Sequence, residues 1–128
     1  AKDPLFAPAE RVDMIKGVIG HVPNVEVLEF DGLLVDFAHE QKCNILVRGL
    51  RVITDFEYEL QLAQTNKIIA PDLETVFLST NLKYSYLSSS IVKEIAVYGG
   101  DISHFVREDI REKVMKRLSE KGLRRNNE

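Results

Sequence analysis

The sequence predicts an α/β protein built on a parallel β-sheet. Three segments typical of strands, residues 25–30, 44–47 and 75–78, alternate along the chain with segments that have the apolar spacing of helices. This alternation is typical of a parallel sheet flanked by helices. In such a sheet, ligands bind beyond the carboxyl ends of the strands.

The first helix is predicted to begin at Pro8, because proline suits the first helical position and Glu10 falls in the first turn. It is expected to end at Gly20. Residues 25–30 alternate apolar and acidic side chains, which predicts a strand. Residues 33–41 are expected to form a short helix. Its inward-facing side chains are predicted to be Leu34, Phe37 and Ala38.

Residues 44–47 predict a buried strand, because they contain the apolar run Ile45, Leu46 and Val47. The next helix has a clear start signal, in which Thr54 is the expected N-cap and Glu57 completes a capping box. Pro71 is expected to end this helix. Its inward stripe is predicted to consist of Leu60, Ala63 and Ile68.

The remaining elements follow the same pattern. Residues 75–78 predict a third strand, and the serines at 88–90 are expected to open a helix that glycines 99–100 close. Residues 108–121 predict a final amphipathic helix. The tail, residues 124–128, is expected to be disordered.

Composition limits the possible functions. The 128 residues are expected to form a single domain over residues 1–128. The net charge of −3 gives no general attraction to nucleic acid or to an anionic membrane. No apolar run approaches the roughly 20 residues of a membrane span, and no signal peptide is expected. Cys43 is the single cysteine, which suits a cytoplasmic protein.

Two arginines follow the apolar run of residues 44–47. Arg48 and Arg51 flank Gly49, which is expected to let the backbone turn tightly and approach a ligand. Arginine's planar fork suits phosphate. An internal ion-pair network is equally compatible with the spacing. Its acidic members would be Asp55, Glu57 and Glu59.

The serines at 88–90 offer a second anion-binding feature. A helix N-terminus has free N–H groups and a positive dipole end, which together bind phosphate. Plain N-capping needs only one serine and is the commoner use of this residue. Tyr84 and Tyr86 precede the serines and are expected either to contact a base or sugar or to pack within the loop. Taken with Arg48 and Arg51, the serines predict a polyphosphate site.

Three motifs carry a resemblance to a known family. They read RGLRVITDFEYELQLAQTNK from Arg48, ETVFL from Glu74 and YSYLSSSIVKEIAVYGGDISHFV from Tyr84. In this order they closely resemble bacterial phosphopantetheine adenylyltransferase, and the match runs from Ala1 to about Leu118. The resemblance implies a Rossmann-like sheet flanked by helices, of the nucleotidyltransferase type.

That resemblance also implies an activity, a set of partners and a set of site residues. The family transfers adenylyl from ATP to 4′-phosphopantetheine with Mg²⁺, giving dephospho-coenzyme A and pyrophosphate, in coenzyme A biosynthesis. It implies a cytoplasmic homohexamer, with coenzyme A as a possible product-like ligand. The implied phosphopantetheine site contains Lys2, Leu34 and Arg48. The implied ATP site contains Gly49, Leu50, Arg51, Glu59, Tyr84, Ser85, Tyr86, Leu87, Ser88, Ser89 and Ser90. Lys2 and Arg51 are expected to support the reacting phosphates.

The sequence also departs from the family pattern. Family members begin with a strand and a G-x-F-D-P-x-T-x-G-H segment, whose threonine and histidine serve the reaction, and neither stands in this sequence. A strand–helix–strand unit, roughly 30 residues, is therefore expected to be missing before Ala1. Two alternatives to the complete enzyme remain: an inactive ATP-binding fragment, and an α/β interaction module whose arginines make only internal salt bridges.

Overall fold

The computed structural model describes residues 3–51 and 53–125, and the chain divides into two compact units. One unit combines residues 1–29 with residues 88–128, and the other comprises residues 30–87. Each unit has its own cluster of buried apolar side chains. No helix in the described part of the chain is long and apolar enough to cross a membrane.

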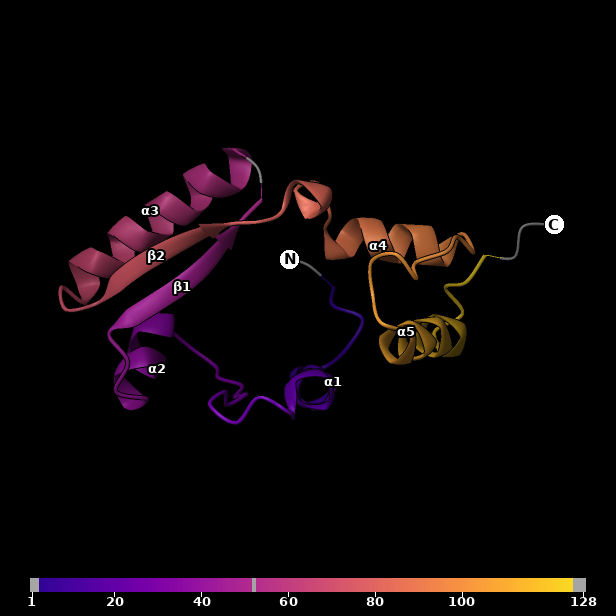
Figure 1. Ribbon diagram of the computed structural model, residues 1–128, viewed down its shortest axis with the longest axis horizontal. Helices are drawn as coiled ribbons and strands as arrows, with labels where there is room; N and C mark the ends of the chain where they lie inside the picture. Colours follow the sequence, from indigo (N-terminus) through magenta and orange to yellow (C-terminus); the bar gives the residue numbers. More distant parts are fainter. Residues whose placement is uncertain (1–2, 52, 126–128) are drawn as a thin grey trace. The chain divides into compact units, whose positions relative to one another are not determined.

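The unit of residues 30–87 contains the sheet (Figure 1). Two parallel strands are paired so that Arg48 lies opposite Phe77 and Leu50 opposite Ser79, which confirms the predicted parallel arrangement. A helix runs along the strands on one side. The elements are α2 (Leu34–Glu40), β1 (Ile45–Leu50), α3 (Ile53–Ile69), β2 (Glu74–Ser79) and a short 3₁₀ helix, η1 (Leu82–Tyr84).

The core of this unit lies at the amino ends of its strands. Its buried members are Val35, Ala38, Ala70 and Leu73, and Leu46 packs against them. In α2 the fully buried neighbour of Ala38 is Val35, whereas the predicted Leu34 and Phe37 are only half-buried. Phe37 instead stacks on Phe30, with ring centroids 4.5 Å apart.

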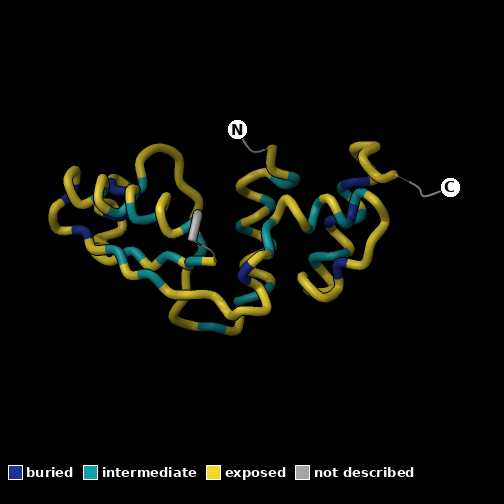
Figure 2. The backbone as a smooth tube through the Cα atoms, turned by 90° about the horizontal axis from the view of Figure 1, so that it is seen from above, coloured by how far each residue is buried: buried dark blue, intermediate teal, exposed yellow. Residues whose placement is uncertain are grey.

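The prediction of a fully buried first strand is wrong. Ile45 is 58% exposed and Val47 is 62% exposed, whereas Leu46 between them is half-buried. Successive side chains of a strand point to opposite faces, and within this unit α3 packs on only one face. Neither β1 nor β2 contains a fully buried residue (Figure 2).

Three further sequence predictions for these segments are corrected. Residues 25–30 form no strand, because their backbone groups make no ladder with any described strand. Helix α3 begins at Ile53, so Thr54 lies inside its first turn and is not its N-cap. Ile68 is 81% exposed, because five residues of helix place it about 140° around the axis from Ala63.

The other unit is helical. It contains α1 (Pro8–Ile19), α4 (Ser89–Val97) and α5 (Glu108–Glu120), and these bounds agree with the predicted helices. Helix α4 is followed by Gly99 at a φ of 77°, the left-handed conformation that glycine adopts without strain. The buried core consists of Ala96, Ile102, Val114 and Leu118.

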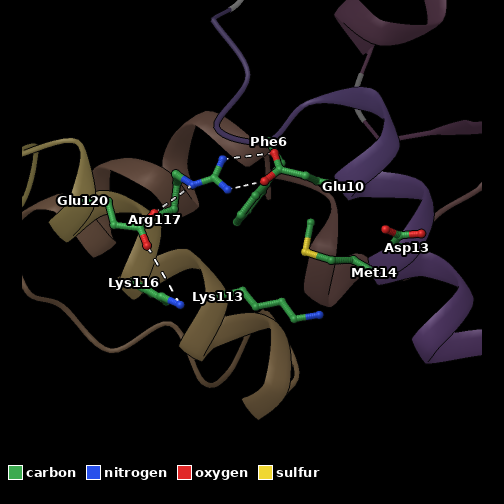
Figure 3. Close-up of a pocket in the computed structure, with 8 residues that line it drawn as sticks. All are labelled: Phe6, Glu10, Asp13, Met14, Lys113, Lys116, Arg117 and Glu120. Atoms are coloured by element: carbon green, nitrogen blue, oxygen red, sulfur yellow. Dashed lines mark hydrogen bonds and ion pairs between the residues drawn. The ribbon is translucent and has the colours of Figure 1, made fainter.

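Arg117 ties the N-terminal segment of this unit to α5 (Figure 3). Its guanidinium donates to the Leu5 carbonyl at 3.1 Å and to both carboxylate oxygens of Glu10. It also lies 5.1 Å from the centroid of the Phe6 ring and 3.4 Å from a Glu120 oxygen. Hydrogen bonds from Arg117 and from the Ala7 N–H lower the pKa of Glu10 to about 2. The cluster borders a pocket of about 280 Å³.

The C-terminal segment makes a backbone hydrogen bond to the last residue of α4. The backbone N–H of Arg125 donates to the Val97 carbonyl at 2.8 Å, and the expected disorder of residues 124–128 stays a prediction. The bond follows a second left-handed glycine, Gly122, that redirects the chain after α5. Residues 126–128 lie outside the described residues.

Candidate functional site

The two arginines lie at the carboxyl end of β1. The strand continues through Leu50, so Arg48 and Gly49 belong to its last half and Arg51 follows it directly. The predicted tight turn at Gly49 is therefore wrong. Gly49 has no positive φ, and a Cβ built on it would meet no described atom within 4 Å. The chain keeps its extended form there because the ladder to β2 runs on to Ser79.

Arg48 is held by Glu59 of α3. Its Nε and Nη2 atoms donate to the two carboxylate oxygens at 2.9 and 2.7 Å. The Glu59 side chain is only 12% exposed, so the carboxylate is sheltered from water, whereas the Arg48 side chain is 39% exposed. The hydrogen bonds lower the pKa of Glu59 and raise the pKa of Arg48. Both groups therefore stay charged at neutral pH, as a bidentate arginine–carboxylate pair requires.

Arg51 makes a comparable pair with Asp55 in the first turn of α3. Its Nε donates to one carboxylate oxygen at 2.8 Å, and its Nη2 donates to the other at 3.4 Å. A third contact is made to the segment after η1, because Nη1 donates to the Leu87 carbonyl at 2.6 Å. Arg51 therefore connects the end of β1, the start of α3 and the segment that follows η1.

These contacts combine the two possibilities that the sequence left open. Arg48 and Arg51 do form internal ion pairs, but the Glu57 side chain makes no ion pair or hydrogen bond with any described residue. Each carboxylate occupies one edge of its guanidinium. An arginine has five N–H donors, so each side chain keeps donors that the described residues do not use. A phosphate needs donors of this kind.

The segment after β2 supplies further candidate groups. Tyr86 is 84% exposed, and Lys83 lies 5.4 Å from the ring centroid of Tyr84. Ser85 is buried, and its hydroxyl donates to the Asn81 carbonyl at 3.4 Å. The exposed Tyr86 ring is therefore open to a ligand, whereas Ser85 serves the turn itself.

The three serines stand at the start of α4, in the other unit. Ser88 is the N-cap, and its hydroxyl accepts a hydrogen bond from the Ile91 N–H at 3.2 Å. Ser89 and Ser90 are exposed, and their hydroxyls make no hydrogen bond within the described chain. Capping therefore uses one serine and leaves two. A joint site of these serines with the arginines stays a prediction.

The remaining predicted site residues include Leu34, Leu50 and Lys2. Leu34 is half-buried at the first position of α2, and Leu50 is paired opposite Ser79 in the sheet. Lys2 lies outside the described residues. Sequence reasoning missed the role of the Leu87 carbonyl, because a backbone acceptor leaves no signal in side-chain patterns.

The described residues do not include a metal centre. No group of three or more histidine, cysteine, aspartate or glutamate side chains among them could hold a metal ion. Asp55 and Glu59, the carboxylates nearest the site, are both engaged by arginines. The donor set therefore does not fit a protein-held magnesium ion.

Comparison with known proteins defines the class of protein first. A family model described as cytidylyltransferase-like matches residues 1–95. The phosphopantetheine adenylyltransferase of Lachnoclostridium phytofermentans is 58% identical over 110 residues, which cover 86% of this chain and 68% of that protein. The enzyme of the same name from Prochlorococcus marinus is 54% identical over 106 residues, which cover 83% of this chain and 68% of that protein. The chain belongs to the cytidylyltransferase-like family and, within it, to the phosphopantetheine adenylyltransferases.

Proposed function

We propose that the chain transfers an adenylyl group from ATP to 4′-phosphopantetheine, forming dephospho-coenzyme A and pyrophosphate. Family membership at 54–58% identity supports this activity. The observation that carries the proposal to particular residues is the pair of strand-end arginines. Each is fixed by a carboxylate and retains N–H donors for phosphate.

The reaction requires little covalent chemistry from the protein. A phosphate oxygen of 4′-phosphopantetheine attacks the α-phosphorus of ATP, a new P–O bond forms, and the bond to the pyrophosphate oxygen breaks. The protein's part is to position the two substrates and to offset charge on their phosphates. In this proposal Arg48 contacts phosphopantetheine and Arg51 contacts ATP, with Lys2 as a further cation. The exposed Ser89, Ser90 and Tyr86 side chains are proposed to complete the ATP site.

Magnesium is proposed to arrive as part of the ATP complex. Mg²⁺ is commonly bound through substrate phosphates with few protein ligands. We also propose a cytoplasmic homohexamer that accepts coenzyme A as a product-like ligand, and these assignments rest on the family resemblance. Light scattering on the purified protein, with and without coenzyme A, measures the size of the assembly.

A pyrophosphate-release assay tests the proposed activity. Pyrophosphate is expected only when both ATP and 4′-phosphopantetheine are present. Omission of either substrate supplies the control. Pyrophosphate release from ATP alone, or ATP binding without release in the complete mixture, would contradict adenylyl transfer by this chain.

A further inference from the structure

Asp55 is placed to control the orientation of Arg51. It lies four residues after the arginine, in the first turn of α3, and accepts two hydrogen bonds along one edge of the guanidinium. The Asp55 side chain is 28% exposed, so the carboxylate is not simply a solvated surface charge.

A second acceptor fixes the same group from another direction. The Leu87 carbonyl accepts from Nη1 at 2.6 Å, so Asp55 and Leu87 together determine the plane of the guanidinium. A long flexible side chain loses rotamer freedom when it binds a ligand. An arginine that is already held in place loses less of this freedom on binding.

We infer that Asp55 is a positioning residue for nucleotide binding, which holds Arg51 with its unused N–H donors directed at an ATP phosphate. This inference rests on the proposed function. It predicts a change in ATP affinity opposite to the one that charge alone predicts. Removing a carboxylate near a polyphosphate should tighten binding by charge alone, whereas loss of positioning should weaken it.

Calorimetry with ATP on the Asp55→Asn variant distinguishes the tighter binding that charge alone predicts from the weaker binding that loss of positioning predicts. The expected result is a roughly 5- to 10-fold increase in Kd. This is less than the roughly 10- to 150-fold that loss of a direct hydrogen bond to a charged group would cause, because Asp55 acts through Arg51. Glu57→Gln is the matched control, because it removes the same charge two residues along the same helix from a side chain with no partner in the described chain. Its ATP affinity should be unchanged or slightly higher. Asp55→Glu should restore part of the loss.

A double variant tests whether Asp55 acts through Arg51. In an Arg51→Ala background, Asp55→Asn should not weaken ATP binding further, since the group that it positions is gone. Arg51→Lys keeps the charge but loses the planar fork, so it should weaken binding nearly as much as Arg51→Ala.

Two results would overturn the inference while leaving the proposed function standing. One is an Asp55→Asn variant that binds ATP as tightly as, or more tightly than, the wild type. The other is an equal loss in both backgrounds, which would show that Asp55 acts independently of Arg51. A wild-type protein that does not bind ATP would instead refute the proposed function, and the inference with it. If Asp55→Asn does not fold, unchanged ATP affinity in Arg51→Lys would also count against the inference.

Discussion

Arginines serve two different purposes in the two units of this protein. Arg117, in the helical unit, contacts a carbonyl, two carboxylates and an aromatic ring, so most of its N–H donors have protein partners. In the sheet unit, Arg48 is held along one edge by Glu59, and Arg51 is held by Asp55 and by the Leu87 carbonyl. Each of the two keeps N–H donors that no described residue uses. An arginine whose donors are satisfied stabilises the fold, whereas one with positioned spare donors is suited to bind an anion.

The largest expected effect concerns Arg51. The Arg51→Ala substitution should weaken ATP binding by about 1.5–3 kcal/mol, because it removes a hydrogen bond between charged groups. Calorimetry on the folded variant measures the change. Unchanged affinity would place Arg51 in the same structural class as Arg117.

Two other arginines provide controls for that experiment. Arg11 is exposed and its side chain makes no ion pair or hydrogen bond within the described residues, so Arg11→Ala should change neither ATP affinity nor stability. Arg117→Ala should lower the melting temperature and leave ATP affinity unchanged, because its contacts are to the protein itself. A loss of ATP affinity in a folded Arg117→Ala variant would contradict the distinction between a structural Arg117 and an ATP-binding Arg51.

A smaller effect separates the serines of α4. Ser88→Ala should reduce stability by about 0.5–2 kcal/mol, since Ser88 is the N-cap and bonds to the Ile91 N–H. Ser90→Ala should leave thermal stability nearly unchanged and weaken ATP binding. Thermal melting and calorimetry on both variants give the two values. If Ser90→Ala changes neither quantity, the serine run is a cap and no more.

The smallest effect is the pH dependence of the Glu10–Arg117 pair. The pKa of Glu10 is lowered to about 2 in the folded protein, below its ordinary value of 4.5. The folded state therefore gains stability from this group above about pH 4.5, and this gain is lost as the pH falls toward 2. Thermal melts from pH 7 to pH 3 should fall less steeply for Glu10→Gln than for the wild type. If the melting temperatures of the two proteins fall in parallel with pH, Glu10 does not contribute to the loss of stability in acid.

Much of the local structure could be predicted because its causes are local. Pro8 and Gly20 bound α1, Ser88 caps α4, and Pro71 follows the end of α3, each through backbone chemistry that the residue itself carries. The strand predicted at residues 25–30 failed because a strand also needs a hydrogen-bonded neighbour. Alternation of apolar and polar side chains does not supply one.

The candidate site shows the same division. The sequence by itself determined that two arginines follow an apolar strand, that carboxylates stand four to eleven residues beyond them, and that three serines open a helix. The tertiary structure decided which carboxylate holds which arginine: Glu59 takes Arg48 and Asp55 takes Arg51, while Glu57 pairs with neither within the described chain. It also brought the Leu87 carbonyl, 36 residues away in the chain, to the Arg51 guanidinium. The physical reason is that pairing depends on the helix face that each side chain occupies and on where a distant backbone runs. Both are set by the packing of α3 against the strands and by the course of the chain after β2, and not by residue order alone.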